Sequence, residues 1–61
     1  MWKFVITAGN DTTLVNFENV LYMTWSAAAD LTEIRFASDQ VIYSTNRPED
    51  ILNSPSFKFT A

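Results

Sequence analysis

The stretch T-E-I-R-F-A-S-D-Q-V-I-Y-S-T, residues 32–45, decides the fold. It holds two alternating apolar runs, Ile34–Phe36 and Val41–Tyr43, separated by the polar pair Ser38-Asp39. Alternation on both sides of a short polar break is typical of a β-hairpin. A two-residue turn at Ser38-Asp39 would place four large apolar side chains on one face: Ile34, Phe36, Val41 and Tyr43. Ile42 is then the one apolar residue on the opposite face.

A second hairpin is expected at the start of the chain. Trp2–Thr7 alternates, and Gly9-Asn10 tolerates the positive φ that a two-residue turn requires. The resulting register pairs Phe4 with Val15. The predicted core face holds Trp2, Phe4, Ile6 and Val15. The opposite side of this predicted hairpin holds Lys3, Val5, Thr7 and Leu14.

The stretch Val20–Trp25 predicts a strand that is apolar on both faces. Val20 and Tyr22 would point to one side of the sheet. Leu21, Met23 and Trp25 would point to the other side. Such a strand is either central in a closed structure or covered by a partner. We predict that the second face of this strand forms a protein-binding surface together with Ile42 and the nearby cation Arg35. The predicted surface consists of Leu21, Met23, Trp25, Ile42 and Arg35. Residues 26–31 are expected to connect this strand to the second hairpin.

A short helix is expected to begin at Pro48, because proline suits the first helical position and acids follow it. Asn46 is chemically a better N-cap than Arg47. Pro55 ends the helix after little more than one turn. The alternation in 56–60 then predicts a short edge strand.

Composition favours one small packed domain over residues 1–61. Hydrophobic residues make up 48% and aromatic residues 15% of the chain, which has no Cys and no His. Disulfides are therefore excluded, no zinc site of the usual kind is expected, and neither metal nor cofactor is predicted. A chain of this length buries only about 60% of its unfolded surface. Aromatic packing and homo-oligomerisation are the expected sources of stability.

The net charge of −3 argues against a surface that binds the phosphate backbone of nucleic acid. The four basic residues are also scattered along the chain and form no cluster in the sequence. No apolar run approaches the ~20 residues of a membrane span, and no signal-peptide pattern appears. We expect a cytoplasmic protein without a membrane partner. Nucleophilic catalysis needs a base beside its nucleophile, and without His or Cys the acids fall mostly at turns and at the helix start. No enzymatic activity is predicted.

Several positions resemble the small FlbD-like proteins of bacterial flagellar operons and phage or bacterial proteins of similar size. The matching residues are Val15-Asn16, Val20, Thr32, Ile34, Phe36, Val41 and Pro48 to Ile51. The resemblance implies an SH3-like, partly open barrel or curved antiparallel sheet with a short helix. Such proteins usually continue into a longer C-terminal helix, which Pro55 prevents here, so a flagellar regulatory role does not carry over.

Three functions follow as hypotheses. The first is a non-enzymatic interaction module that self-associates through the apolar face around Met23 and binds another protein, as a phage or prophage accessory protein modulating a host protein would. The second is a small nucleic-acid-binding regulator that uses the strand aromatics with Lys3, Arg35 and Lys58. The third is a structural oligomer of a virion.

Overall fold

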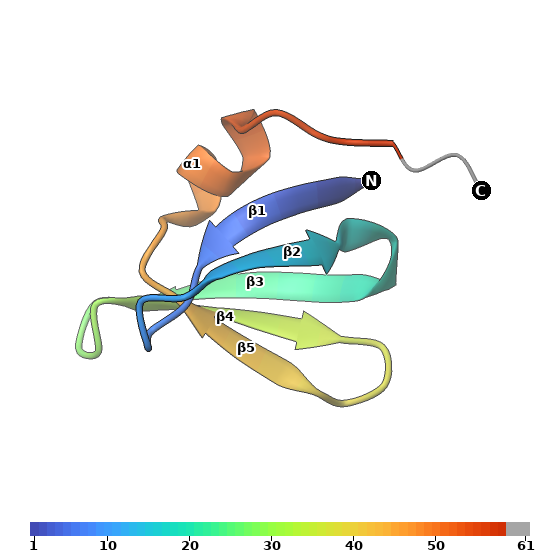
Figure 1. The fold of residues 1–61 in the computed structure, drawn as a ribbon. Coiled ribbons are helices and arrows are strands. Elements are labelled where there is room, and N and C mark those ends of the chain that lie inside the picture. Colours follow the sequence, from blue (N-terminus) through green and yellow to red (C-terminus); the bar gives the residue numbers. More distant parts are fainter. Residues whose placement is uncertain (59–61) are drawn as a thin grey trace.

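The computed structural model describes residues 1–58, which form five antiparallel strands in two sheets and one short α-helix (Figure 1). The elements are β1 (Trp2–Ile6), β2 (Thr12–Asn16), the 3-10 turn η1 (Phe17–Asn19), β3 (Val20–Ser26), β4 (Leu31–Phe36), β5 (Val41–Ser44) and α1 (Pro48–Asn53). β1 and β2 pair in one sheet, and β3, β4 and β5 lie in that order in the other. The predicted all-β fold with a short C-terminal helix is confirmed, and the described strands do not close into a barrel.

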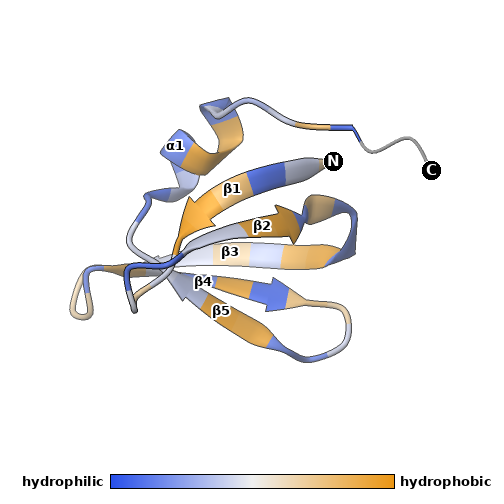
Figure 2. Ribbon diagram, viewed as in Figure 1, coloured by the Kyte–Doolittle hydropathy of each residue, from blue (hydrophilic) through white to orange (hydrophobic). Residues whose placement is uncertain are grey.

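The core is small and is shared by the two sheets and the helix. Its fully buried apolar side chains are Val5, Val15, Ile34 and Ile51. Partly buried residues pack around them: Phe17, Val20, Met23, Phe36 and Ile42. In Figure 2 apolar residues appear as orange bands on the strands and on part of α1.

The hairpin of β4 and β5 differs from the prediction by one residue of register. Ile34 pairs with Ile42, and Glu33 pairs with Tyr43. The turn has three residues rather than two, because Asp39 adopts a left-handed φ of 69° and its N–H bonds back to Phe36 O at 2.9 Å. A one-residue shift moves every side chain of a strand to the other face. The predicted pairing of Ile34 with Tyr43 is wrong, and Ile42 belongs to the core.

The hairpin of β1 and β2 is also shifted by one residue from the predicted register. Lys3 pairs with Val15 and Phe4 with Leu14, whereas the prediction paired Phe4 with Val15. Asn10 takes the left-handed conformation, with φ 67°. Val15 is buried, and β1 residues on its side of the sheet are buried with it. The two faces of β1 are therefore reversed: Lys3 and Val5 are 5% and 1% exposed, and Phe4 and Ile6 are 49% and 39% exposed.

A β-bulge changes the faces of β3. Val20 pairs with Phe36 and Tyr22 with Arg35, which leaves Leu21 as the extra residue. A bulge of this kind places two residues of one strand opposite one of its partner. Val20 packs against the core, and Leu21 and Tyr22 are both exposed. The prediction that Val20 and Tyr22 share a face is wrong for this reason.

Lys3 joins the first strand to the last helix. Its ammonium group donates to the carbonyl oxygens of Ile51, Leu52 and Ser54 at 2.9, 2.8 and 2.9 Å. The last carbonyls of a helix have no partner within the helix, so a cation placed there satisfies them and also complements the helix dipole. All three donors of the ammonium group are used, which makes its burial tolerable.

Asn46 anchors the chain before α1 and does not cap the helix. Its Oδ1 accepts from Ile6 N at 2.7 Å, and its carbonyl accepts from Thr32 Oγ1 at 2.6 Å. The N-cap is Arg47, without a side-chain hydrogen bond, so the preference for Asn46 as the cap is wrong. Buried Ser44 completes this polar cluster by donating from Oγ to Ile6 O at 2.7 Å.

The chain from β5 to residue 57 covers the second edge of β1 at both of its ends. Ser44 forms a bridge to Thr7 at one end, and Phe57 forms a bridge to Trp2 at the other. Figure 1 shows α1 and the segment after it running along β1 between these points. Of the edge strand predicted over residues 56–60, Phe57 alone pairs within the described residues, and Phe59 and Thr60 lie outside them.

Replacing Lys3 with Met should lower the free energy of unfolding by about 1–3 kcal/mol, because the part-buried carbonyls of Leu52 and Ser54 lose their donor. Lys58→Met removes the same charge from an exposed residue and should change stability by less than about 0.5 kcal/mol. Urea denaturation followed by tryptophan fluorescence measures both. Equal effects of the two substitutions would contradict a structural role for Lys3.

Asp30, whose backbone adopts the left-handed conformation, gives a second prediction. Asp30, with φ 57°, precedes β4 and has no side-chain hydrogen bond among the described residues. Asp30→Val should cost about 1–2 kcal/mol, because a β-branched side chain is strained at positive φ. Asp30→Gly should leave stability nearly unchanged, since glycine adopts this conformation freely. Thermal unfolding of the two variants separates backbone strain from loss of the carboxylate, which both substitutions remove.

Candidate protein-interaction surface

The sheet of β3, β4 and β5 turns one face away from the core. Its register places Tyr22, Arg35 and Val41 in one row and Thr24, Glu33 and Tyr43 in the next. These rows alternate with the row of Met23, Ile34 and Ile42, which packs in the core. With the bulged Leu21, we call this surface the outer face: Leu21, Tyr22, Thr24, Glu33, Arg35, Val41 and Tyr43.

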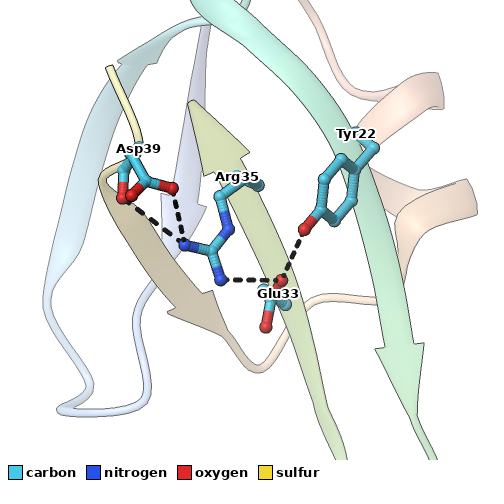
Figure 3. A network of polar contacts seen from close by, with 4 residues as sticks. All are labelled: Tyr22, Glu33, Arg35 and Asp39. Carbon is cyan, nitrogen blue, oxygen red and sulfur yellow. Dashed lines mark hydrogen bonds and ion pairs between the residues drawn. The ribbon is translucent and has the colours of Figure 1, made fainter. Parts of the chain in front are cut away.

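A polar network fixes Arg35 in the middle of the outer face (Figure 3). Its guanidinium donates from Nη2 to Glu33 Oε2 and from Nη1 to Asp39 Oδ1, both at 3.4 Å. Tyr22 donates its hydroxyl to the same Glu33 oxygen at 3.3 Å. The Tyr22 side chain has the largest effect and raises the pKa of Arg35; desolvation lowers this pKa, and the Glu33 carboxylate raises it further. The guanidinium is a permanent cation with a carboxylate partner on each side.

Apolar and aromatic surface surrounds this network. Tyr22 and Tyr43 are 48% and 46% exposed, and Leu21 is 66% exposed. The Nε atom of Arg35 is buried and has no hydrogen-bond partner among the described residues. Tyrosine and arginine are the residue types enriched at the centres of protein interfaces, where one part of the side chain packs and another bonds. The outer face has the composition of a protein-binding surface.

The structure does not bring the five predicted interface residues to one surface. Leu21 and Arg35 lie on the outer face, whereas Met23 and Ile42 pack against the core. Trp25 is half-buried on the core side of β3, and the guanidinium of Arg47 lies 4.4 Å from its ring centroid.

Sequence reasoning missed Tyr22 and Tyr43, because their faces depend on the bulge and on the turn. The one available signal is Asp39, since Asp tolerates the left-handed conformation that a three-residue turn needs at its last position.

Three of the four basic residues contact other groups of the molecule, although Arg47 is itself exposed. Lys3 is bound to carbonyls, Arg35 to two carboxylates and Arg47 lies over Trp25, while Lys58 is exposed. Six of the seven acidic residues are exposed: Asp11, Glu18, Asp30, Asp39, Glu49 and Asp50. Of these, Glu18 forms an ion pair with the terminal amino group at 3.2 Å. The accessible surface is thus more acidic than the net charge of −3 suggests.

Comparison of the chain with protein-family models, with curated proteins and with solved structures found no match. The described part of the chain has no helix long and apolar enough to cross a membrane. Nor do three or more acidic side chains gather within residues 1–58 in a way that could hold a metal ion.

The network should orient Arg35 rather than stabilise the fold. A double-mutant cycle with Glu33→Gln and Arg35→Met should give only a small coupling energy, because both side chains remain partly in contact with water. The coupling should fall as salt is raised, because exposed charges are screened. Urea denaturation of the four proteins at low and high salt measures it. A large coupling energy that does not change with salt would contradict the expectation.

Proposed function

We propose that this chain is a non-enzymatic protein-interaction module that binds another protein through the outer face. The observation that carries the proposal is the pair of half-exposed tyrosines, Tyr22 and Tyr43, on either side of the fixed guanidinium of Arg35. Each tyrosine offers a flat apolar ring and a hydroxyl, and the arginine offers further donors. Residues of these types contribute most of the binding energy in many interfaces.

Preorganisation supports the same proposal. Binding usually costs free energy to immobilise side chains, about 0.5–1.5 kcal/mol for each flexible one. Here Glu33 and Asp39 already hold the guanidinium, and the Tyr22 hydroxyl is bonded to Glu33. The residues stand on paired strands of one sheet, so the face needs little ordering on contact. At its rim, the side chain of Asp39 is 95% exposed and is placed to steer a basic partner.

The charge distribution favours a protein partner over nucleic acid. A surface that follows phosphates needs clustered cations. Three of the four basic residues already bind groups within the molecule. The phage or prophage accessory role and the SH3-like outline belong to the same proposal and rest on the sequence resemblance. A virion component would use such a face for assembly, which is also protein binding.

A photo-crosslinking experiment tests the proposal. Benzoylphenylalanine placed at Tyr43 should give a discrete covalent adduct with one host protein, identified by mass spectrometry. The same group at Leu52, which is 66% exposed on α1, is the matched control and should give none. With the captured partner purified, Tyr22→Ala should weaken binding by about tenfold or more, as expected for the loss of an interface hot spot.

Two outcomes would contradict the proposal. One is the same set of adducts from positions 43 and 52, which would show nonspecific contact. The other is a captured partner whose affinity does not change in Tyr22→Ala and Arg35→Ala variants that keep the circular dichroism spectrum of the parent.

A further inference from the structure

We propose that a second copy of this chain covers the outward side of the β1–β2 sheet. We call this surface the N-terminal face, made of Phe4, Ile6, Leu14 and Phe57. Phe4, Phe57 and Ile6 are 49%, 43% and 39% exposed. The rings of Phe4 and Phe57 meet edge to face, with centroids 5.2 Å apart and planes at 73°. Phe4 pairs directly with Leu14 across the two strands. Contiguous apolar surface of this kind marks interaction sites.

The absence of charge on this face favours a second copy as the occupant. The outward positions of this sheet are three cross-strand pairs, Trp2 with Asn16, Phe4 with Leu14 and Ile6 with Thr12. None of these residues is charged, whereas six exposed acids lie elsewhere on a chain of net charge −3. Two identical acidic molecules repel each other wherever their carboxylates would meet. These three pairs bring no carboxylate against a partner, and a basic partner would find none among them.

The size of the core points the same way. Among the described residues only four apolar side chains are fully buried, while eight large apolar residues remain more than a third exposed. Domains of this size without disulfides or metals commonly gain stability from oligomerisation. Burial of Phe4 and Ile6 against the same residues of a partner would add the apolar contact that one chain lacks.

Addition of a strand at the second edge of β1 is disfavoured. The second edge of β1 already bonds to other parts of the chain: Trp2 N–H to Phe57 O at 3.3 Å, and Thr45 N–H to Ile6 O at 2.9 Å. A second copy therefore has no free edge of β1 to extend. In a two-fold arrangement the same patch serves both molecules. This dimer leaves the outer face of the other sheet uncovered, so the inference does not depend on the proposed function.

Sedimentation equilibrium over a range of micromolar concentrations tests the inference. The wild-type chain should be a dimer, and Phe4→Glu should raise the dissociation constant of the dimer by about thirtyfold or more, as for a lost hot spot. The matched control Leu52→Glu introduces the same charge at another exposed apolar residue and should leave the dimer intact. If Phe4→Glu does not fold, Ile6→Lys tests the same face with the opposite charge.

A distance measurement gives an independent check. The chain has no Cys, so Ala8→Cys, in the exposed turn beside the N-terminal face, carries a single nitroxide label. Pulsed electron resonance should show one short intermolecular distance for this label, and a distinctly longer one for a label at Thr24 in the other sheet. A wild-type monomer at high micromolar concentration would overturn the proposal and leave the face to another occupant. A dimer that persists in folded Phe4→Glu would overturn it as well.

Discussion

The buried ammonium group of Lys3 is the contact on which the rest of the structure depends. α1 has six residues, too few to be stable as an isolated helix, and its N-cap makes no side-chain hydrogen bond. It is held by Ile51, which is buried in the core, and by the three carbonyls that Lys3 binds. The helix in turn contributes one of the four fully buried apolar residues. A single cation thus links the strand that begins the fold to the helix that completes the core.

Elements were predictable from this sequence, and registers were not. Alternation located the strands, and Pro48 with the acids after it located the helix, because these signals depend on neighbouring residues alone. Register depends on whether a turn has two or three residues between its strands. Asn10 and Asp39 both adopt the left-handed conformation, and each adds one residue to its turn. A difference of one residue was enough to reverse the faces of β1 and β5.

The candidate site was predictable only in part for the same reason. Arg35 and Leu21 were expected at a surface and lie on one. Met23 and Ile42 were assigned to that surface by strict alternation, which the bulge in β3 and the turn before β5 interrupt. Tyr22 and Tyr43 took the exposed positions instead. A bulge has no dependable sequence signal in a stretch as uniformly apolar as Val20–Trp25, so this part of the surface required the structure.

The span of the Lys3 contacts has a consequence for how the molecule forms. The three bonds join residues separated by 48, 49 and 51 positions in the sequence. Contacts between residues that are distant in the sequence form late in folding. Closing the long loop between them costs conformational entropy before the contacts contribute any stabilisation. During synthesis β1 leaves the ribosome before α1, so its lysine has none of these carbonyl partners until α1 has also emerged. Until then the nascent chain carries an uncompensated cation on the face that must be buried, which disfavours premature collapse of the early hairpins.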